Sequence, residues 1–301
     1  MVYLNGNFVQ KDKAYISVMD RGFLFGDGVY EVFPIYNNNV FGLDSHLNRL
    51  QAGLDAINIK NPHSNIEWLG LIKKIISFNK DINQAVYLQV SRGCDDDRKH
   101  THNILTPTVY IQSTGIQPRT KDSLLSGKSV ISREDIRWLQ CNTKATSLLA
   151  NIMYSQEAKE LGSEEAILYR DNVVTEGSSS NVFIVKKDCI FTHPKGQHIL
   201  PGITREVVIK IAKLLNLKIK ENAFDMTSLM NADEVWITSS TREILPITTV
   251  DNKIINNGLA GPIWSVIYDQ YQSLKTLKAV SYTHLRAHET PEHLVCRLLL
   301  E

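Results

Sequence analysis

The sequence predicts a protein of mixed helices and strands, in the α+β or α/β class, organised in two domains. Runs rich in β-branched and aromatic residues, such as GVYEVFPIY, are typical of strands, whereas segments such as DSHLNRLQAGLDAINI have the periodicity of a helix. The two patterns alternate in both halves of the chain. Its 301 residues are enough for about two domains, each with a core of its own.

The first predicted domain covers residues 1–116 and opens with a hairpin, VYLNGNFV. Asn5 and Gly6 supply the positive φ angles of the tight turn between its two strands. A second hairpin is predicted over residues 28–43, where three asparagines separate two apolar runs.

A helix is predicted over residues 44–59, because its leucines recur on one helical face. Asp44 or Ser45 can cap its first turn. The remaining elements predicted for this domain are a helix over residues 66–79 and strands over 85–91 and 106–113.

Residues 117–123 are predicted to connect the two domains, because proline, glycine and polar residues replace the regular patterns there. The second predicted domain covers residues 124–275. Its predicted strands are 128–132, 165–170, 181–186 and 234–239, and its predicted helices are 147–161, 204–216 and 262–274.

The final residues, 276–301, differ from the rest of the chain. The segment SYTHLRAHET resembles translated sequencing-adapter read-through, so we expect this tail to be non-native and exclude it from functional inference. A genuine amphipathic extension is the alternative. Re-sequencing the gene would distinguish the two.

Charge and composition exclude several classes of function. With 33 basic and 32 acidic residues the formal charge is +1, which favours neither nucleic acid nor an anionic membrane as a partner. The amino terminus lacks the pattern of a signal peptide, and no stretch approaches the roughly 18 apolar residues of a membrane span. We therefore expect a cytoplasmic protein. The four cysteines include no C-x-x-C pair, so neither a disulfide framework nor a zinc ribbon is predicted.

A crowded run of charges, SRGCDDDRKHTH, occupies residues 91–102 between two predicted strands. It can be interpreted as a metal site built on His100, His102 and the aspartates, as a solvated loop, or as a device that holds an acidic substrate. The residues of the run do not decide among these three interpretations.

Lys144 is the first candidate for chemistry. A strand-like run ends at Cys141, a polar turn follows, and Lys144 precedes an apolar helix with few obvious carboxylate partners nearby. Most lysines are solvated surface charges. The alternative is a partly buried amine with a lowered pKa that acts as a Schiff-base nucleophile.

Further candidates could hold a charged ligand. Glu176 lies in VVTEGSSSNVFIV, which is either a plain hairpin with a polar turn or a strand that delivers an acid to a sheet edge. Ile203 and Thr204 lie in the first turn of a predicted helix, where free backbone N–H groups suit a phosphate unless this is a simple helix start.

Hydroxyl groups and an arginine complete the set. Ser239, Ser240 and Thr241 follow another predicted strand, and Arg49 shares a helical face with His46 and Gly53. A lysine nucleophile, an acid, two anion sites and an arginine together indicate a site for pyridoxal phosphate.

The chain resembles the fold-type IV pyridoxal-phosphate aminotransferases, and within them the D-amino-acid aminotransferases. The resemblance covers about residues 1–275 and rests on VMDRGFLFGDGVYEV, EDIRWLQCNTKATSLL, QEAKELGSEEAILYRDNVVTEGSSSNVFIV, ILPGITREVV and DEVWITSSTREILP. It implies a small amino-terminal α+β domain, a larger barrel-like domain, a cofactor between them, and a homodimer.

The resemblance also implies roles for single residues. Lys144 is expected to bind the cofactor covalently and to act as the general base, and Glu176 is expected to partner the pyridine nitrogen. The residues implied to hold the phosphate are Arg49, Ile203, Thr204 and Ser240.

Substrate binding is implied for three more residues. Tyr30, together with Arg98 and His100 from the neighbouring subunit, matches the residues that hold the α-carboxylate in D-amino-acid relatives. Asp95 to Asp97 lie where this loop is about one residue longer than in the family, and they could pair with Arg98.

The expected activity is therefore ping-pong transamination between a D-amino acid such as D-alanine and a 2-oxo acid such as 2-oxoglutarate. The alternatives are a branched-chain L-amino-acid aminotransferase, an aminodeoxychorismate lyase, or a cofactor-free binding protein on the same fold. The Arg98 and His100 pair favours the D-amino-acid enzyme over these alternatives.

Overall fold

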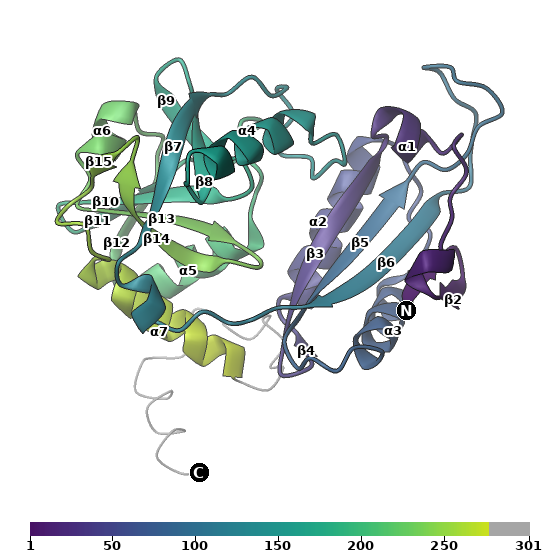
Figure 1. Cartoon of the computed structure of the whole chain (residues 1–301), viewed down its shortest axis with the longest axis horizontal. Helices are drawn as coiled ribbons and strands as arrows, with labels where there is room; N and C mark the ends of the chain where they lie inside the picture. Colours follow the sequence, from purple (N-terminus) through teal and green to yellow (C-terminus); the bar gives the residue numbers. More distant parts are fainter. Residues whose placement is uncertain (277–301) are drawn as a thin grey trace, which may run out of the picture.

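The computed structural model describes residues 1–276, which form two sheets with helices packed on them (Figure 1). The first sheet has six antiparallel strands in the order β2-β1-β6-β5-β3-β4. They are β1 (Val2–Leu4), β2 (Asn7–Val9), β3 (Gly28–Tyr36), β4 (Asn39–Val40), β5 (Gln84–Ser91) and β6 (Thr108–Gly115). The short helix α1 (Arg21–Phe25) precedes β3, and α2 (Leu43–Ala56) and α3 (Asn65–Ser77) pack against the sheet.

The predicted helical face of α2 is confirmed, because Leu47, Leu50 and Leu54 are all buried in the core of this sheet. The predicted cap is wrong. The helix begins at Leu43, and Gly42, with a φ of 69°, takes the cap position without a side-chain hydrogen bond. The tight turn after β4 needs a left-handed residue there, so the helix starts before the polar side chains can cap it.

The second sheet has nine strands, eight of them in the order β12-β11-β10-β13-β14-β7-β8-β9, with β15 paired to β14. They are β7 (Lys128–Glu134), β8 (Glu165–Arg170), β9 (Val173–Gly177), β10 (Asn181–Lys186), β11 (Cys189–Thr192), β12 (Lys218–Glu221), β13 (Glu234–Ser239), β14 (Glu243–Val250) and β15 (Lys253–Ile254). A tight turn, in which the Gly177 N–H donates to the Ser180 carbonyl, brings β9 back beside β10 and curls the sheet.

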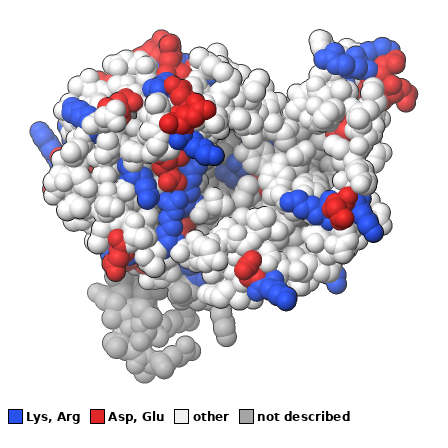
Figure 2. Space-filling model, viewed as in Figure 1, with Lys and Arg blue, Asp and Glu red and all other residues white. Residues whose placement is uncertain are grey.

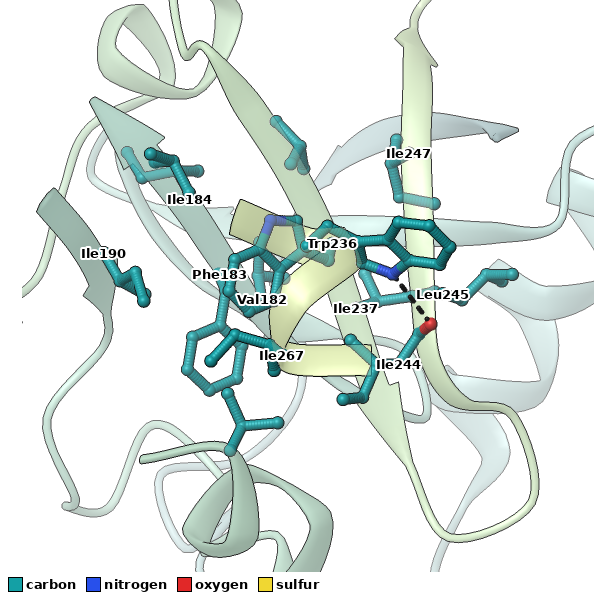
Figure 3. Packing of buried hydrophobic residues seen from close by; sticks show 14 of the residues in the cluster. Val182, Phe183, Ile184, Ile190, Trp236, Ile237, Ile244, Leu245, Ile247 and Ile267 are labelled. Atoms are coloured by element: carbon teal, nitrogen blue, oxygen red, sulfur yellow. Dashed lines mark hydrogen bonds between the residues drawn. The ribbon is translucent and has the colours of Figure 1, made fainter. Parts of the chain in front are cut away.

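Four helices accompany this sheet: α4 (Leu149–Glu160), α5 (Ile203–Leu214), α6 (Met226–Met230) and α7 (Pro262–Thr276). The core beneath α5 and α7 is centred on Trp236, whose ring stacks on Phe183 at 5.3 Å between centroids (Figure 3). The indole N–H of Trp264 donates to the Ile244 carbonyl at 3.1 Å, so this buried donor is satisfied.

The strands and long helices predicted by residue range are all present, but the strand-like run that ends at Cys141 is not a strand and one helix begins late. Residues 135–141 form a loop rather than a strand, because Asp135 and Arg137 turn inward to pair with each other. The helix predicted from residue 147 begins only at Leu149. The sequence patterns also missed α1, α6, β11, β12, β14 and β15.

The two sheets fall on either side of residues 116–127, which contain the predicted connection. The domain limits of 1–116 and 124–275 remain a prediction. The tail predicted to be non-native, except Thr276 at the end of α7, lies outside the described residues, as does Cys296. Cys94, Cys141 and Cys189 are free thiols. Within the part of the chain that the structure describes, every helix is too short or too polar to cross a bilayer.

Candidate active site

A cavity of about 1030 Å³ lies between the two sheets, and residues from both line it. The first sheet and its helices contribute Phe25, Tyr30 and Arg49. The second contributes the loop before α4, the turn between β9 and β10, the start of α5 and the end of β13. The space-filling view shows the hollow between the two parts of the molecule (Figure 2). A ligand in this cavity would contact segments that are far apart in the sequence.

Lys144 lies in the cavity wall, on the extended loop before α4. This loop is tied to β3 by a bridge between Val29 and Ala145 and by the Tyr30 N–H, which donates to the Lys144 carbonyl at 3.0 Å. The Lys144 Nζ lies 4.3 Å from the centre of the Tyr30 ring. Among the described residues, no carboxylate forms an ion pair with Lys144. Its amine is therefore available to a ligand.

Glu176, at the end of β9, is buried in the wall of the same cavity. One carboxylate oxygen accepts from Arg137 at 2.7 Å, and the other accepts from the Leu200 N–H at 2.9 Å and from Asn181 at 3.2 Å. Burial raises the pKa of Glu176 to about 7, although Arg137 and the Leu200 N–H act in the opposite direction. A carboxyl group held this firmly can face a protonated ring nitrogen.

This raised pKa leads to a prediction for the cofactor-free protein. The folded state binds the Glu176 proton more tightly than the unfolded state, so the contribution of Glu176 to the free energy of unfolding should fall as pH rises from about 4.5 to about 7 and change little above that. Glu176→Gln should reduce this fall. Urea unfolding of both proteins at several pH values between 5 and 8 measures the change in the free energy of unfolding with pH. The same change in both proteins would contradict a raised pKa for Glu176.

Arg137 was missed by the sequence analysis, although it organises the acidic end of the cavity. Its guanidinium bridges Glu176 and Asp135, and Asp135 also accepts from Thr175 beneath it. Burial alone would lower the pKa of Arg137, but the two carboxylates raise it, so it remains a cation. The segment EDIRWLQ carries no signal for this contact, because Arg137 and Glu176 are 39 residues apart.

The start of α5, close to Glu176 in the cavity wall, suits an anion. Gly202 caps α5 without a side-chain hydrogen bond, so the N–H groups of Ile203 and Thr204 point outward as at any helix start. A Cβ added to Gly202 would lie 2.0 Å from Asn181 Oδ1, so only glycine allows this close turn. The hydroxyl of Thr238 in the cavity wall is buried and has no hydrogen-bond partner within residues 1–276, and Ser239 and Ser240 follow it.

Arg49 also lines the cavity, but its guanidinium is largely engaged. It donates twice to the buried Glu31 and once to the Pro201 carbonyl at 3.0 Å, just before α5. Burial alone would raise the pKa of Glu31, yet Arg49 and His46 together hold it well below its usual range. Arg49 therefore links α2 to the anion-binding end of the cavity.

The structure separates the three residues predicted to bind substrate. Tyr30 lines the cavity, whereas Arg98 and His100 lie exposed on the loop between β5 and β6, outside the cavity of their own chain. This loop projects from the molecule at the upper right of Figure 1. Arg98 and His100 both lie against the Phe25 ring, at 4.9 Å and 5.8 Å. Their predicted contact with the site of a neighbouring subunit remains a prediction.

The aspartates of this loop do not pair with Arg98. Asp97 pairs with Lys99 at 2.8 Å, and Asp95 lies 4.0 Å from Arg21, so the guanidinium of Arg98 remains available. Residues 1–276 contain no group of three or more His, Cys, Asp and Glu side chains that could hold a metal ion.

The fold and the cavity define a class of protein, and the comparison with known families gives the same class. Residues 28–250 match the family described as amino-transferase class IV, and the chain belongs to this family. It is 41% identical to the D-alanine aminotransferase of Bacillus licheniformis over 263 residues, which cover 87% of this chain and 92% of that protein. It is 36% identical to the D-alanine aminotransferase of Staphylococcus aureus strain N315 over 274 residues, or 90% and 96% of the two chains.

Solved structures share the whole fold. The branched-chain amino acid aminotransferase of Escherichia coli superposes with a TM-score of 0.84 at 25% identity, over 91% of this chain and 94% of that one. The branched-chain aminotransferase of Thermoproteus uzoniensis, solved with norvaline, has a TM-score of 0.81 at 27% identity over the same shares. The two-domain fold-type IV architecture predicted from the resemblance is therefore confirmed.

Pyridoxal phosphate is the cofactor of this class of enzyme and of this protein. The cavity fits it, because its lining includes a free amine, a buried carboxylate and, beside a helix start, a hydroxyl that has no hydrogen-bond partner among the described residues. When bound, the cofactor supplies an electron sink for the bonds to the substrate α-carbon.

Proposed function

We propose that the protein is a D-amino-acid transaminase, which transfers the amino group of a D-amino acid such as D-alanine to a 2-oxo acid such as 2-oxoglutarate. The products would be pyruvate and D-glutamate, formed in two half-reactions of a ping-pong mechanism. The observation that carries this proposal is 36 to 41% identity, over about nine-tenths of the chain, to D-alanine aminotransferases.

The proposed cofactor contacts are those that the family resemblance implies, and they are supported by the presence of all these residues in the lining of one cavity. Lys144 would hold the cofactor covalently, and once the substrate amino group has displaced it, its free amine would move the proton at the substrate α-carbon. The absence of an ion pair to Lys144 among the described residues supports this role. Glu176, oriented by Arg137, would stabilise a proton on the ring nitrogen of the cofactor. The residues that would contact the phosphate group of the cofactor are Arg49, Ile203, Thr204 and Ser240.

Substrate binding in this proposal requires a homodimer. Tyr30 lies in the cavity, and Arg98 and His100 from the partner would complete the site for the α-carboxylate. An apolar rim beside the cavity supports a partner there, because its side chains are each more than half exposed. They are Ile136, Trp138, Leu149 and Ile152. A cytoplasmic location is part of the same proposal.

The stereochemistry of the products tests the proposal. The protein is incubated with 2-oxoglutarate and either D-alanine or L-leucine, and the glutamate formed is resolved chirally. D-Glutamate from D-alanine is expected. L-Glutamate from L-leucine alone would identify a branched-chain aminotransferase, the class of the solved structures that share this fold. Pyruvate release from aminodeoxychorismate without an amino acceptor would identify the lyase.

Arg98→Ala should raise the KM for D-alanine strongly, by about tenfold or more, because the α-carboxylate loses a bidentate cation. Cofactor affinity should change little, since Arg98 lies outside the cavity of its own chain. Lys80→Ala is the matched control, because Lys80 is an exposed lysine before the start of β5, at the other end of that strand from this loop, and does not line the cavity. Equal KM values for both variants and the unsubstituted enzyme would exclude Arg98 from the carboxylate site.

A further inference from the structure

A buried carboxylate outside the cavity organises the turn between β9 and β10. Glu165, at the start of β8, is only 1% exposed. It accepts hydrogen bonds from the hydroxyls of Ser178, Ser179 and Ser180, at 3.3 Å, 3.1 Å and 3.1 Å, and from the Ser179 N–H. A Cβ on Gly177 would lie 2.6 Å from Glu165 Oε1, so the glycine allows the turn to close on the carboxylate.

Arg242 connects this carboxylate to a second segment of the cavity wall. Its guanidinium pairs with Glu165, donates to the Ser179 hydroxyl at 2.7 Å, and lies 3.8 Å from Glu164. Its backbone N–H donates to the Ser239 hydroxyl at 3.3 Å. One arginine therefore joins the turn after β9 to the turn after β13.

Both joined turns belong to the cavity. Ser178, Ser179 and Ser180 line it from one turn, and Ser239 and Ser240 line it from the other. The second turn is also held from behind, because the side chain of Glu243 is bonded to Lys275 and Gln272 of α7. Glu243 has a φ of 59°, so these contacts stabilise a backbone conformation that costs energy in a residue other than glycine.

We propose that Arg242 and Glu165 form a clamp that positions the serine turns and thereby sets the affinity of the cavity for the phosphate group of its cofactor. Neither residue lines the cavity, so both act as positioning residues. This inference rests on the phosphate site assigned above.

Two physical effects contribute to the clamp. The shared arginine fixes hydroxyl groups that would otherwise have to be ordered when a ligand binds. It also neutralises a buried carboxylate, since Glu165 without Arg242 would place an uncompensated negative charge directly behind the turns that face the phosphate.

The test compares two ligands, pyridoxal phosphate and pyridoxal, which lacks the phosphate group. Their dissociation constants are measured by absorbance titration of the cofactor-free dimer. Arg242→Met should weaken the binding of pyridoxal phosphate about tenfold or more and leave that of pyridoxal little changed. Arg242→Lys should retain part of the preference for pyridoxal phosphate over pyridoxal. The double variant Arg242→Met/Glu165→Gln should regain part of that preference relative to Arg242→Met, because it lacks the uncompensated negative charge of Glu165.

Arg133→Met is the matched control, because Arg133 pairs with Glu157 in the same half of the chain and does not line the cavity. Its preference for the phosphorylated ligand should equal that of the unsubstituted protein. If Arg242→Met does not fold, Arg242→Lys and Glu165→Gln carry the same comparison.

The outcomes separate this inference from the function on which it rests. If the unsubstituted protein binds both ligands equally, the phosphate site is wrong and the clamp falls with it. If the unsubstituted protein prefers pyridoxal phosphate but Arg242→Met keeps that preference, or loses both ligands equally, only the clamp is refuted.

Discussion

Lys144→Ala should abolish transamination, with a fall in kcat of at least about 10³-fold, because the variant loses both the covalent attachment and the general base. Stability should change little, since Lys144 is only partly buried and forms no ion pair among the described residues. Borohydride reduction of the unsubstituted holoenzyme, followed by peptide mass analysis, should find the pyridoxyl group on Lys144. The variant should carry none.

The matched control for this experiment is Lys187→Ala. Lys187 lies in the exposed turn between β10 and β11, far from the residues that line the cavity. It should leave kcat and the borohydride label unchanged. A label on a lysine other than Lys144 in the unsubstituted enzyme would overturn the assignment.

Glu176→Gln should lower kcat by about 10²- to 10³-fold, because an amide cannot hold the positive charge on the ring nitrogen as a carboxylate does. The covalent attachment at Lys144 should persist, so the variant should still take up the borohydride label. This combination of low kcat and intact attachment separates a loss of electronic stabilisation from a loss of binding. Steady-state kinetics and the label together measure it.

Glu157→Gln serves as the control for Glu176→Gln. Glu157 also pairs with an arginine, Arg133, but it lies on the outer side of α4 and does not line the cavity. Its kcat should match that of the unsubstituted enzyme. If Glu176→Gln retained full activity, the partner of the ring nitrogen would have to be sought elsewhere in the cavity wall.

Local sequence signals predicted most of the regular structure. The leucines of α2 and the turn at Asn5 and Gly6 are encoded within a few residues, and both features are present. The errors arose where a contact with another part of the chain outweighs the local pattern. The strand-like run that ends at Cys141 is a loop in the structure. Its Arg137 side chain pairs with Glu176, and its Asp135 side chain accepts a hydrogen bond from Thr175.

The residues of the candidate site also divide into those that local sequence indicates and those that only contacts between distant segments reveal. Lys144, Glu176 and the start of α5 were each weak candidates in their own segments, and they indicated a pyridoxal phosphate site only in combination and through the family resemblance. The structure brings all three to one cavity. Arg137 and Thr238 were not predicted, because nothing in their own segments distinguishes them from ordinary polar residues. The charged loop was ambiguous for a similar reason. Only the tertiary structure shows that Asp97 pairs with Lys99, which leaves the guanidinium of Arg98 available to bind a carboxylate.

By itself the sequence predicted the mixed fold, with strands and helices in both halves of the chain, and a lysine, an acid and a helix start that together suit pyridoxal phosphate. These features depend on residue type and on spacing within single segments. The tertiary structure decided which distant side chains meet. Arg137 reaches Glu176, and Arg242 reaches Glu165, only because the curled sheet brings their segments together. Such contacts depend on how the strands pair and how the core packs, and the periodicity of one segment carries no information about its distant neighbours.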